Sequence, residues 1–366
     1  MGKFNSLTLA EKVGQLFVIG IAGPELDQAT IDLVDEIQPG GVCLFARNIK
    51  SLEQTRELLD SIARRSKITP ILAVDEEGGS VDRLRRVMTP SPAANKLRTA
   101  KDAADQAAII GETLHLLGFN TDFAPVVDVV DAERAKHSNG LFSRAYGSTK
   151  EEVTDLAGAF LGELQTRNIT GCIKHFPGLG AARVDSHEAL PFVEITEAEL
   201  SEVDLFPYRV LIESGDVRMI MVAHVAFPNH QLQQLSSDGK PLPASLSYNF
   251  VTKTLRGQLG YDGVVITDDL EMGAIMRNYG IGEACKLAVL AGNDLLAICA
   301  EPANIRDGFR FVLQAVENGE ISESRLDESL DRIACFKERF NQPPPLDIGR
   351  LDQLSAATAQ LAARVG

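Results

Sequence analysis

Two residues that could transfer a proton, Asp185 and His187, stand two positions apart in the sequence. Pro177, Gly178 and Gly180 lie shortly before them, and these residue types interrupt regular structure, so we expect the pair on a loop. Side chains at i and i+2 point the same way where a loop is extended. A carboxylate beside an imidazole fixes its tautomer and raises its pKa, which suits a general acid/base. The alternative is a surface loop that carries two unrelated polar residues.

A candidate nucleophile follows the β-branched run at residues 264–267. Asp268 and Asp269 come directly after this run. Aspartate is a favourable N-cap, and residues 270–276 could begin a helix, so we assign this structural role to Asp269. Asp268, at the end of the predicted strand, is the better candidate for a nucleophile.

The elements that would position these residues alternate along the chain. Short apolar runs, often β-branched and typical of strands buried on both faces, occupy residues 16–21, 41–45, 71–74, 121–127, 172–174, 219–224, 264–267 and 295–299. Amphipathic segments with a period of 3.6 residues lie between them, for example at 51–66 and 153–164. Eight parallel strands with intervening helices are the pattern of a (β/α)₈ TIM-type barrel, so we expect this α/β fold in a single domain. An open doubly wound sheet is the alternative, but no Gly-x-Gly-x-x-Gly follows the first strand.

Polar residues come after the predicted strands, where a barrel places its working side chains. Besides Asp268, they are Asp75, Arg83, Asp128, Lys174, His175 and His224. Because the carboxyl ends of barrel strands share one face, we expect these side chains to gather there.

A metal centre is a competing explanation for this group, with His175, Asp185, His187 and His224 as possible ligands. A barrel metallo-hydrolase would be expected to show His-x-His at its first strand, but the first histidine in the chain is His115. No His-x-x-x-His spacing occurs either. We therefore expect no metal and no cofactor.

The bulk composition limits the class of protein. The chain has 366 residues, of which 45% are hydrophobic and 24% charged, as in globular domains. Its formal net charge of −15 argues against nucleic-acid and anionic-membrane partners. Its five cysteines are scattered without a CxxC pair, so neither a disulfide framework nor a zinc ribbon is indicated. No apolar run reaches the ~18 residues of a membrane span, and the start shows no secretion signal, so we expect a cytoplasmic protein.

One break in the chain suggests a boundary. Three consecutive prolines at 343–345 end the preceding helix and give a stiff spacer. We predict the catalytic barrel over residues 1–340, followed by a proline-rich linker and a C-terminal tail helix over 341–366.

Taken together, seven segments resemble glycoside hydrolase family 3, specifically its β-N-acetylglucosaminidase branch. They lie at residues 41–48, 75–83, 122–128, 143–147, 174–178, 185–187 and 255–270, in the order in which the family has them. The Lys-His-Phe-Pro-Gly run at 174–178, together with Asp-Ser-His at 185–187, is the feature of this branch.

The resemblance implies a role for each matching residue. Asp268 would form the glycosyl-enzyme, while His187, oriented by Asp185, would protonate the leaving oxygen and then activate water. The residues that would bind the sugar are Asp75, Arg83, Arg144, Lys174 and His175, with His224 in the pocket wall. Two positions depart from the family pattern: Leu179 stands where a histidine is common and Ser80 where an arginine is common. Neither is assigned to the chemistry, so these departures bear on substrate preference.

The expected activity is that of a retaining exo-β-N-acetylglucosaminidase. The resemblance implies a small carbohydrate substrate, namely peptidoglycan fragments in which GlcNAc is joined to 1,6-anhydro-MurNAc. A β-glucosidase or a GlcNAc phosphorylase of the same family is the alternative. A non-catalytic sugar-binding protein is a third possibility, which the presence of Asp185, His187 and Asp268 disfavours.

Overall fold

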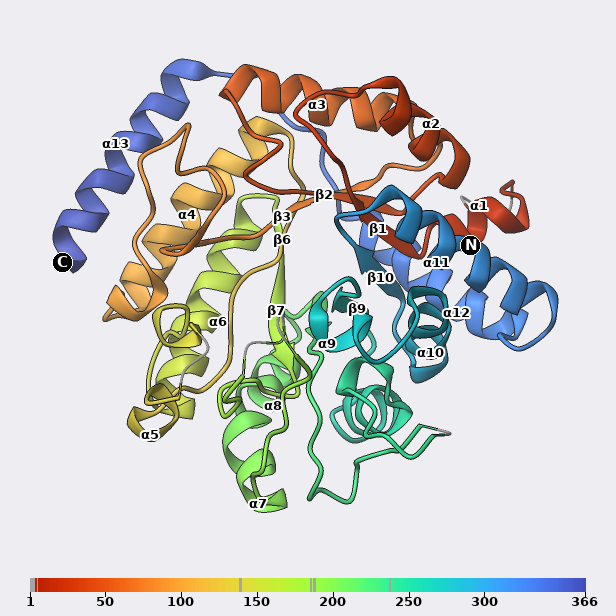
Figure 1. The fold of residues 1–366 in the computed structure, drawn as a ribbon. Helices are drawn as coiled ribbons and strands as arrows, with labels where there is room; N and C mark the ends of the chain where they lie inside the picture. The colour runs from red at the N-terminus through yellow and green to blue at the C-terminus, as the bar shows by residue number, and fades with distance from the viewer. Residues whose placement is uncertain (1–3, 5, 138–139, 185, 187–188, 237) are drawn as a thin grey trace.

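The computed structural model of the chain (Figure 1) describes residues 4, 6–137, 140–184, 186, 189–236 and 238–366. Within these residues, eight parallel strands close into a barrel in the order β1, β10, β9, β8, β7, β6, β3 and β2. They are β1 (Phe17–Gly20), β2 (Gly41–Leu44), β3 (Ile71–Val74), β6 (Thr121–Asp122), β7 (Thr170–Phe176), β8 (Met219–Val222), β9 (Val264–Asp269) and β10 (Leu295–Ile298). The expected (β/α)₈ barrel is thereby confirmed, and the doubly wound alternative is wrong.

Strand β1 closes the barrel because it pairs with strands from both ends of the sheet. Its Val18 lies opposite Gly41 of β2 on one side and Ala297 of β10 on the other. Nearly all strand residues are buried, since helices cover the outside and side chains fill the inside. This double burial explains why the strands read as continuous apolar runs in the sequence.

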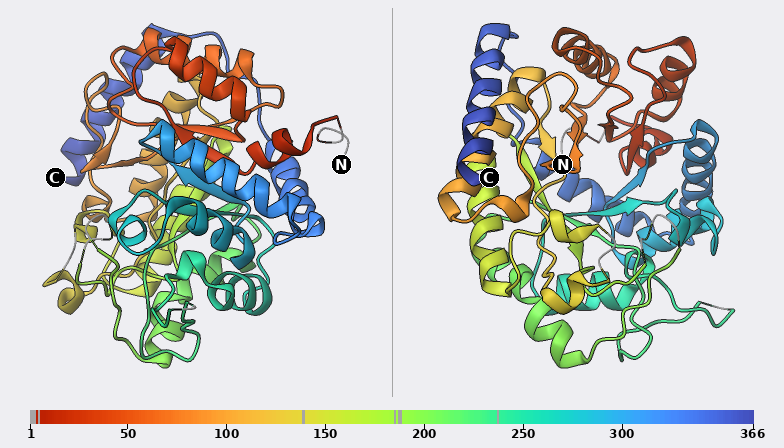
Figure 2. Two further views of the ribbon diagram at one scale, coloured as in Figure 1. Left: turned by 45° about the vertical axis from the view of Figure 1, so that its right-hand side comes forward. Right: turned by 60° about the vertical axis from the view of Figure 1, so that its left-hand side comes forward.

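Helices surround the barrel (Figure 2). They are α1 (Leu9–Gly14), α2 (Gln28–Ile37), α3 (Leu52–Arg65), α4 (Ala100–Leu117), α5 (Ala132–Ala135), α6 (Lys150–Thr166), α7 (Glu197–Glu199), α8 (Phe206–Glu213), α9 (Gly273–Met276), α10 (Ile281–Ala291), α11 (Pro302–Glu317), α12 (Glu323–Lys337) and α13 (Ile348–Val365). Short 3₁₀ turns occupy Ala94–Lys96, Leu141–Ser143 and Ala244–Leu246, and π-helical segments occupy Leu200–Asp204 and Asn249–Gln258. Across the described part of the chain, no helix combines the length and the apolar character needed to cross a bilayer.

Strands β6 and β7 differ most from their expected lengths, whereas the other six differ by two residues at most. The run at 121–127 forms regular strand only at β6, because Pro125 has no N–H to donate to a neighbour; parallel pairing resumes as an isolated bridge between Val126 and Lys174. Strand β7 extends beyond the expected 172–174 at both ends. A hairpin of β4 (Glu76–Gly78) and β5 (Val81–Asp82) follows β3 and was not expected from the apolar pattern, because its residues are mostly polar.

The C-terminal helix α13 lies along α4 on the outside of the barrel (Figure 1). Its buried face includes Leu351 and Leu354. The guanidinium of Arg350 lies 2.5 Å from Glu112 of α4, and that of Arg364 lies 3.0 Å from Asp102. The helix therefore docks through both apolar and ionic contacts. The division of the chain at residue 340 stays a prediction.

Candidate active site

A cavity of about 150 Å³ opens at the end of the barrel where the strands finish. The residues that line it are Cys43, Phe45, Asp75, Val81, Arg83, Phe123, Arg144, Lys174, His175, Met221, Asp268, Asp269, Met272, Ala297 and Cys299. Six of the nine predicted site residues are among them. The volume is below the roughly 300–1,000 Å³ of drug-sized pockets, so the cavity suits one small ring rather than an extended chain.

Asp268 lies near the end of β9, which pairs with strands on both sides and holds the residue rigidly. Its Oδ1 accepts a hydrogen bond from the N–H of Asp269 at 2.8 Å. Burial would raise the pKa of this carboxyl group, but the charges of His175, His224 and Lys174, with that N–H, outweigh burial and lower it. Asp268 is therefore ionised at neutral pH, as a carboxylate nucleophile must be.

Asp269 also belongs to β9 and does not cap a helix. Its Oδ1 accepts from the N–H of Glu271 at 3.0 Å and from that of Cys299 at 3.3 Å. The next helix, α9, follows Met272 instead, so the helix-cap interpretation of Asp269 is wrong. The carboxylate instead joins the end of β9 to the end of β10, and burial raises its pKa to about 7.

Lys174 of β7 is a buried cation, with 2% of its surface exposed. Its Nζ lies 2.6 Å from Oδ1 of Asp75 and 2.6 Å from Oε1 of Glu77. Burial would lower the pKa of Lys174, but these two carboxylates outweigh it and raise the pKa. Lys174 is therefore charged and fixes Asp75 at the cavity.

Glu77 holds a second cation in place. The Nε and Nη2 atoms of Arg144 each lie 2.8 Å from one of its carboxylate oxygens, which is a bidentate pair. Burial would raise the pKa of Glu77, but Arg144 and Lys174 hold it well below its usual range. Nη2 of Arg144 also lies 3.3 Å from Nε2 of His175. Glu77 thus connects the charged side chains of this cavity, although the sequence did not single it out.

Asp128 connects the cavity to the loop that follows β7. Its Oδ2 accepts from Nδ1 of His175 at 2.7 Å, and its Oδ1 accepts from the N–H of Leu179 at 2.6 Å. Asp128 is almost fully buried. One carboxylate therefore orients a cavity imidazole and also anchors the start of the loop that carries Asp185 and His187.

Arg83 reaches the cavity from the β4–β5 hairpin. Oε2 of Glu76 accepts from the N–H groups of Arg83 at 2.8 Å and Leu84 at 3.1 Å. The guanidinium of Arg83 lies 3.7 Å from Oδ2 of Asp75 and 5.6 Å from the centroid of the Phe45 ring. The hairpin thus anchors the backbone of Arg83, and its side chain lines the cavity beside Asp75 and Phe45.

His224 is fully buried and is not among the residues that line the cavity, although a pocket-wall role was expected. Its Nδ1 lies 2.7 Å from Oγ of Ser245, and its Nε2 lies 2.9 Å from the carbonyl oxygen of Asp269. The predicted acid/base pair, Asp185 and His187, lies outside the described residues. Ser186, between them in sequence, is buried, and its carbonyl oxygen accepts from the N–H of Ala274 in α9 at 3.1 Å.

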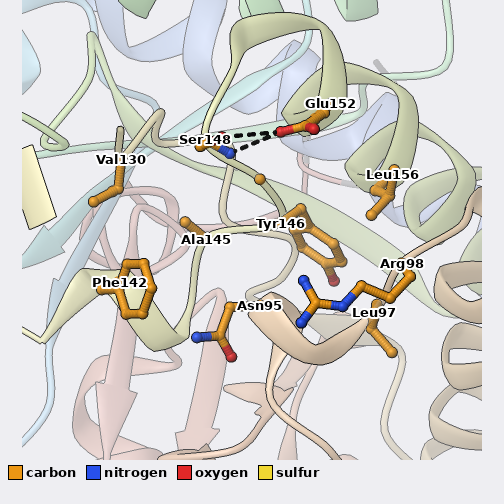
Figure 3. A pocket seen from close by; sticks show the side chains of 11 residues that line it. Asn95, Leu97, Arg98, Val130, Phe142, Ala145, Tyr146, Ser148, Glu152 and Leu156 are labelled. Atoms are coloured by element: carbon orange, nitrogen blue, oxygen red, sulfur yellow. Dashed lines mark hydrogen bonds between the residues drawn. The ribbon is translucent and has the colours of Figure 1, made fainter. Parts of the chain in front are cut away.

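A second groove, of about 300 Å³, lies between the segments that precede α4 and α6 (Figure 3). Arg98 and Tyr146 are among its walls, and Glu152 is the one carboxylate among the described residues that line it. Oε2 of Glu152 accepts from the N–H of Ser148 at 3.0 Å and belongs to the capping box of α6. Because this carboxylate serves the helix end, we place the chemistry in the barrel cavity.

Comparison with known proteins now identifies the family. The family model described as "Glycosyl hydrolase family 3 N terminal domain" matches residues 8–336. The chain belongs to glycoside hydrolase family 3. The resemblance that the seven segments indicated is thereby confirmed, and so is the expectation that the protein is an enzyme.

Relatives within family 3 are about one-third identical to this chain in sequence over the aligned residues. It is 32% identical over 342 residues to a beta-hexosaminidase of Tolumonas auensis, covering 88% of this chain and 98% of the relative. It is 31% identical over 341 residues to beta-hexosaminidase A of Pseudoalteromonas piscicida, but spans only 56% of that longer protein. The structure of a family 3 beta-N-acetylglucosaminidase from Paenibacillus sp. str. FPU-7 superimposes with a TM-score of 0.87 at 34% identity, covering 97% of this chain and 69% of that one.

Two acidic residues of this site were not singled out in the sequence, and the contacts of a third, Asp128, were not expected. Glu76 and Glu77 directly follow Asp75, so the run of three acidic residues at a strand end was the available signal. Asp128 was noticed only as a residue after a strand. Its partners, His175 and Leu179, are 47 and 51 positions away in the chain, and no local pattern could show those contacts.

Proposed function

We propose that this family 3 chain removes terminal N-acetylglucosamine from the non-reducing end of small β-glycosides, with retention of configuration. The observation that carries the proposal is the ionised Asp268 in a small cavity, opposite the fixed charges of Asp75, Lys174 and Arg144. The names of the relatives, beta-hexosaminidase and beta-N-acetylglucosaminidase, support the choice of sugar.

The proposed reaction has two displacements at the anomeric carbon. In the first, a carboxylate oxygen of Asp268 bonds to this carbon, the bond to the aglycone oxygen breaks, and His187 gives that oxygen a proton. In the second, His187 takes a proton from water, and the water oxygen displaces Asp268 to release the sugar. Asp185 would orient His187 and favour its protonated form. The roles of Asp185 and His187 rest on the sequence resemblance, and acid/base catalysis of this kind contributes roughly 10²–10⁴-fold.

The other charged residues would bind the sugar. Asp75 is suited to accept hydrogen bonds from hydroxyl groups, while Lys174 and Arg83 are suited to donate them. Because these groups are already held by one another, binding would cost little side-chain entropy. Arg144 and His175 would complete the ring of polar contacts.

The natural substrate that we propose is a peptidoglycan fragment in which GlcNAc is linked to 1,6-anhydro-MurNAc. This substrate, and the cytoplasmic location that would suit the recycling of such fragments, follow from the sequence resemblance and stay predictions. The small cavity is consistent with a single sugar at the cleaved end.

Turnover of aryl glycosides tests the proposal. Aryl β-GlcNAc and aryl β-glucoside are compared, each with and without phosphate. We expect fast release from the β-GlcNAc substrate alone and no effect of phosphate. Recovery of a sugar 1-phosphate would identify a phosphorylase, and faster turnover of the β-glucoside would identify a β-glucosidase. If neither aryl glycoside reacts, the disaccharide of GlcNAc and 1,6-anhydro-MurNAc is the deciding substrate, and its failure as well would overturn the proposal.

Replacing Asp128 with asparagine is expected to lower kcat/KM for the aryl β-GlcNAc substrate by about 10- to 100-fold. The change removes the charge from hydrogen bonds to His175 and Leu179, and such bonds contribute about 1.5–3 kcal/mol each. Steady-state kinetics and thermal unfolding are measured together. Wild-type kinetics in a folded Asp128→Asn chain would show that this carboxylate does not position the site.

A further inference from the structure

The cavity that contains Asp268 is rich in sulfur. The chain has five cysteines and six methionines, and two of each line this one cavity. Cys43 lies on β2, Met221 on β8, Met272 after β9, and Cys299 directly after β10. Thiols and thioethers are weak hydrogen-bonding groups for a sugar, but they are strong ligands for soft metal ions.

The two cysteines meet across β1. Gly20, the last residue of β1, pairs with Cys43 of β2. On the other side of β1, Cys299 follows β10, and a Cβ placed on Gly20 would lie 1.9 Å from its carbonyl oxygen. Because Ile19 of β1 pairs with Ile298 of β10, Cys299 stands beside Gly20 on this side, and the glycine leaves room for its backbone. Cys43 and Cys299 therefore flank the same residue of β1, and both line the cavity.

The pair is poorly placed for a disulfide. Strand β1 separates β2 from β10, so the two backbones are two strand spacings, or about 9–10 Å, apart. A disulfide requires Cα atoms within about 7 Å and sulfur atoms about 2 Å apart. When a metal ion bridges two sulfur atoms, these atoms stay farther apart than they do in a disulfide. A bridging ion can therefore join the two side chains without moving the strands.

We propose that Cys43 and Cys299 bind one Cu(I) ion in the cavity that Met221 and Met272 also line, and that the bound ion blocks the sugar cavity. Each thiol releases its proton to solvent as its sulfur–copper bond forms, so binding one ion releases two protons. The resulting bis-thiolate carries one negative charge, and neither copper nor sulfur changes its oxidation state. Soft thiolate and thioether ligands select Cu(I) in this way.

Zinc is not the expected occupant. Zn²⁺ in proteins takes four nitrogen, sulfur or oxygen ligands in a tetrahedron. Over the described ranges of the chain, no group of three or more His, Cys, Asp or Glu side chains is arranged to hold a metal ion. The cations that border the cavity do not oppose Cu(I) strongly, because Lys174 and Arg144 are both paired with Glu77.

An anaerobic copper titration tests the site directly and without substrate. Cu(I) is delivered from its coloured bicinchoninate complex to the 366-residue chain carrying Cys335→Ser, which removes the exposed thiol. We expect one Cu(I) per chain, and about 100-fold or more weaker binding after Cys43→Ser or Cys299→Ser. The matched control is Cys285→Ser, a buried cysteine of α10, and should bind as tightly as the parent. Zn²⁺ should not displace the copper.

Several results would overturn the proposal. One is an unchanged Cu(I) affinity in the double variant that carries Cys43→Ser and Cys299→Ser. Another is Cu(I) binding that is lost when Cys335 is replaced. If the serine variants fail to fold by thermal unfolding, Met221→Leu and Met272→Leu serve instead, and the proposal fails if neither weakens binding by about 10-fold. Loss of aryl-glycoside turnover in proportion to bound copper would support blockage, whereas full turnover in the copper-loaded chain would refute it. Because affinity is measured without a sugar, this test stands apart from the proposed hydrolase activity.

Discussion

Replacing Asp268 with alanine is expected to lower kcat for an aryl β-N-acetylglucosaminide by about 10⁵-fold or more, the scale of loss when an enzyme loses its nucleophile. The physical reason is that Asp268 combines two properties that a carboxylate nucleophile needs. It lines the cavity at the end of a strand that is paired on both sides, and its pKa is lowered. Stability should change little, because its carboxylate accepts a hydrogen bond only from its neighbour's N–H among the described residues. Turnover and thermal unfolding are measured on the same preparation.

A matched control and a rescue sharpen this result. Asp262→Ala removes an aspartate whose side chain is 88% exposed, and it should leave turnover unchanged. Azide added to Asp268→Gly should restore turnover by supplying an external nucleophile and should give a glycosyl azide. If Asp268→Ala keeps more than a hundredth of wild-type activity, a different residue forms the glycosyl-enzyme, and Asp269 is the next to test.

The lowered pKa of Asp268 also has a consequence for the pH profile. The ordinary pKa of an aspartate is 3.8, and the folded value lies below it. Protonation of Asp268 therefore does not reduce activity until the pH falls below about 4. Any loss of kcat/KM between pH 5 and 7 belongs to another group, for which His187 and Asp269, whose pKa is raised to about 7, are the candidates.

The barrel could be predicted because its strands are buried on both faces. Such strands give continuous apolar runs, and the runs ended at the polar residues that the structure brings to one cavity: Asp75, Lys174, His175 and Asp268. Barrel topology explains why these residues gather, because it places the carboxyl end of every strand on the same face. Local pattern and global fold agree at these positions.

The remaining parts of the site depend on contacts that are distant in sequence. Asp269 was expected to cap a helix, a frequent local role for aspartate, but it accepts a hydrogen bond from the N–H of Cys299, directly after the neighbouring strand β10, instead. Cys43 and Cys299 lie within separate apolar runs of the sequence, and only the position of β1 between β2 and β10 brings both to the same cavity. Side-chain direction at the end of a strand is set by these tertiary contacts, and no sequence period encodes it.

Replacing Glu77 with glutamine is expected to destabilise the fold by about 3–5 kcal/mol, because breaking a buried ion pair leaves its partners uncompensated. Here the partners are two, Lys174 at 2.6 Å and Arg144 at 2.8 Å. In a chain of 366 residues we expect the melting temperature to fall by about 4–7 °C. Turnover should fall as well, since both cations border the sugar cavity. Thermal and denaturant unfolding measure the first effect, and aryl-glycoside kinetics the second.

The adjacent residue provides the control, because Glu76 is also a buried glutamate. Burial, together with Asp82 and Asp122, raises the pKa of Glu76 well above its ordinary 4.5. Its Oε2 accepts from the backbone N–H groups of Arg83 and Leu84, which a glutamine oxygen can also do, so Glu76→Gln should cost far less. For Glu77 the folded pKa lies below the unfolded value of 4.5, so the unfolded chain binds more protons between the two values. The stability that Glu77 contributes is therefore complete above about pH 4.5 and declines as the pH falls further. The difference in the free energy of unfolding between wild type and Glu77→Gln should therefore become smaller as the pH is lowered below about 4.5. Equal effects of the two substitutions at pH 7 would mean that charge does not distinguish these neighbours, and that Glu77 does not hold the cations of this site.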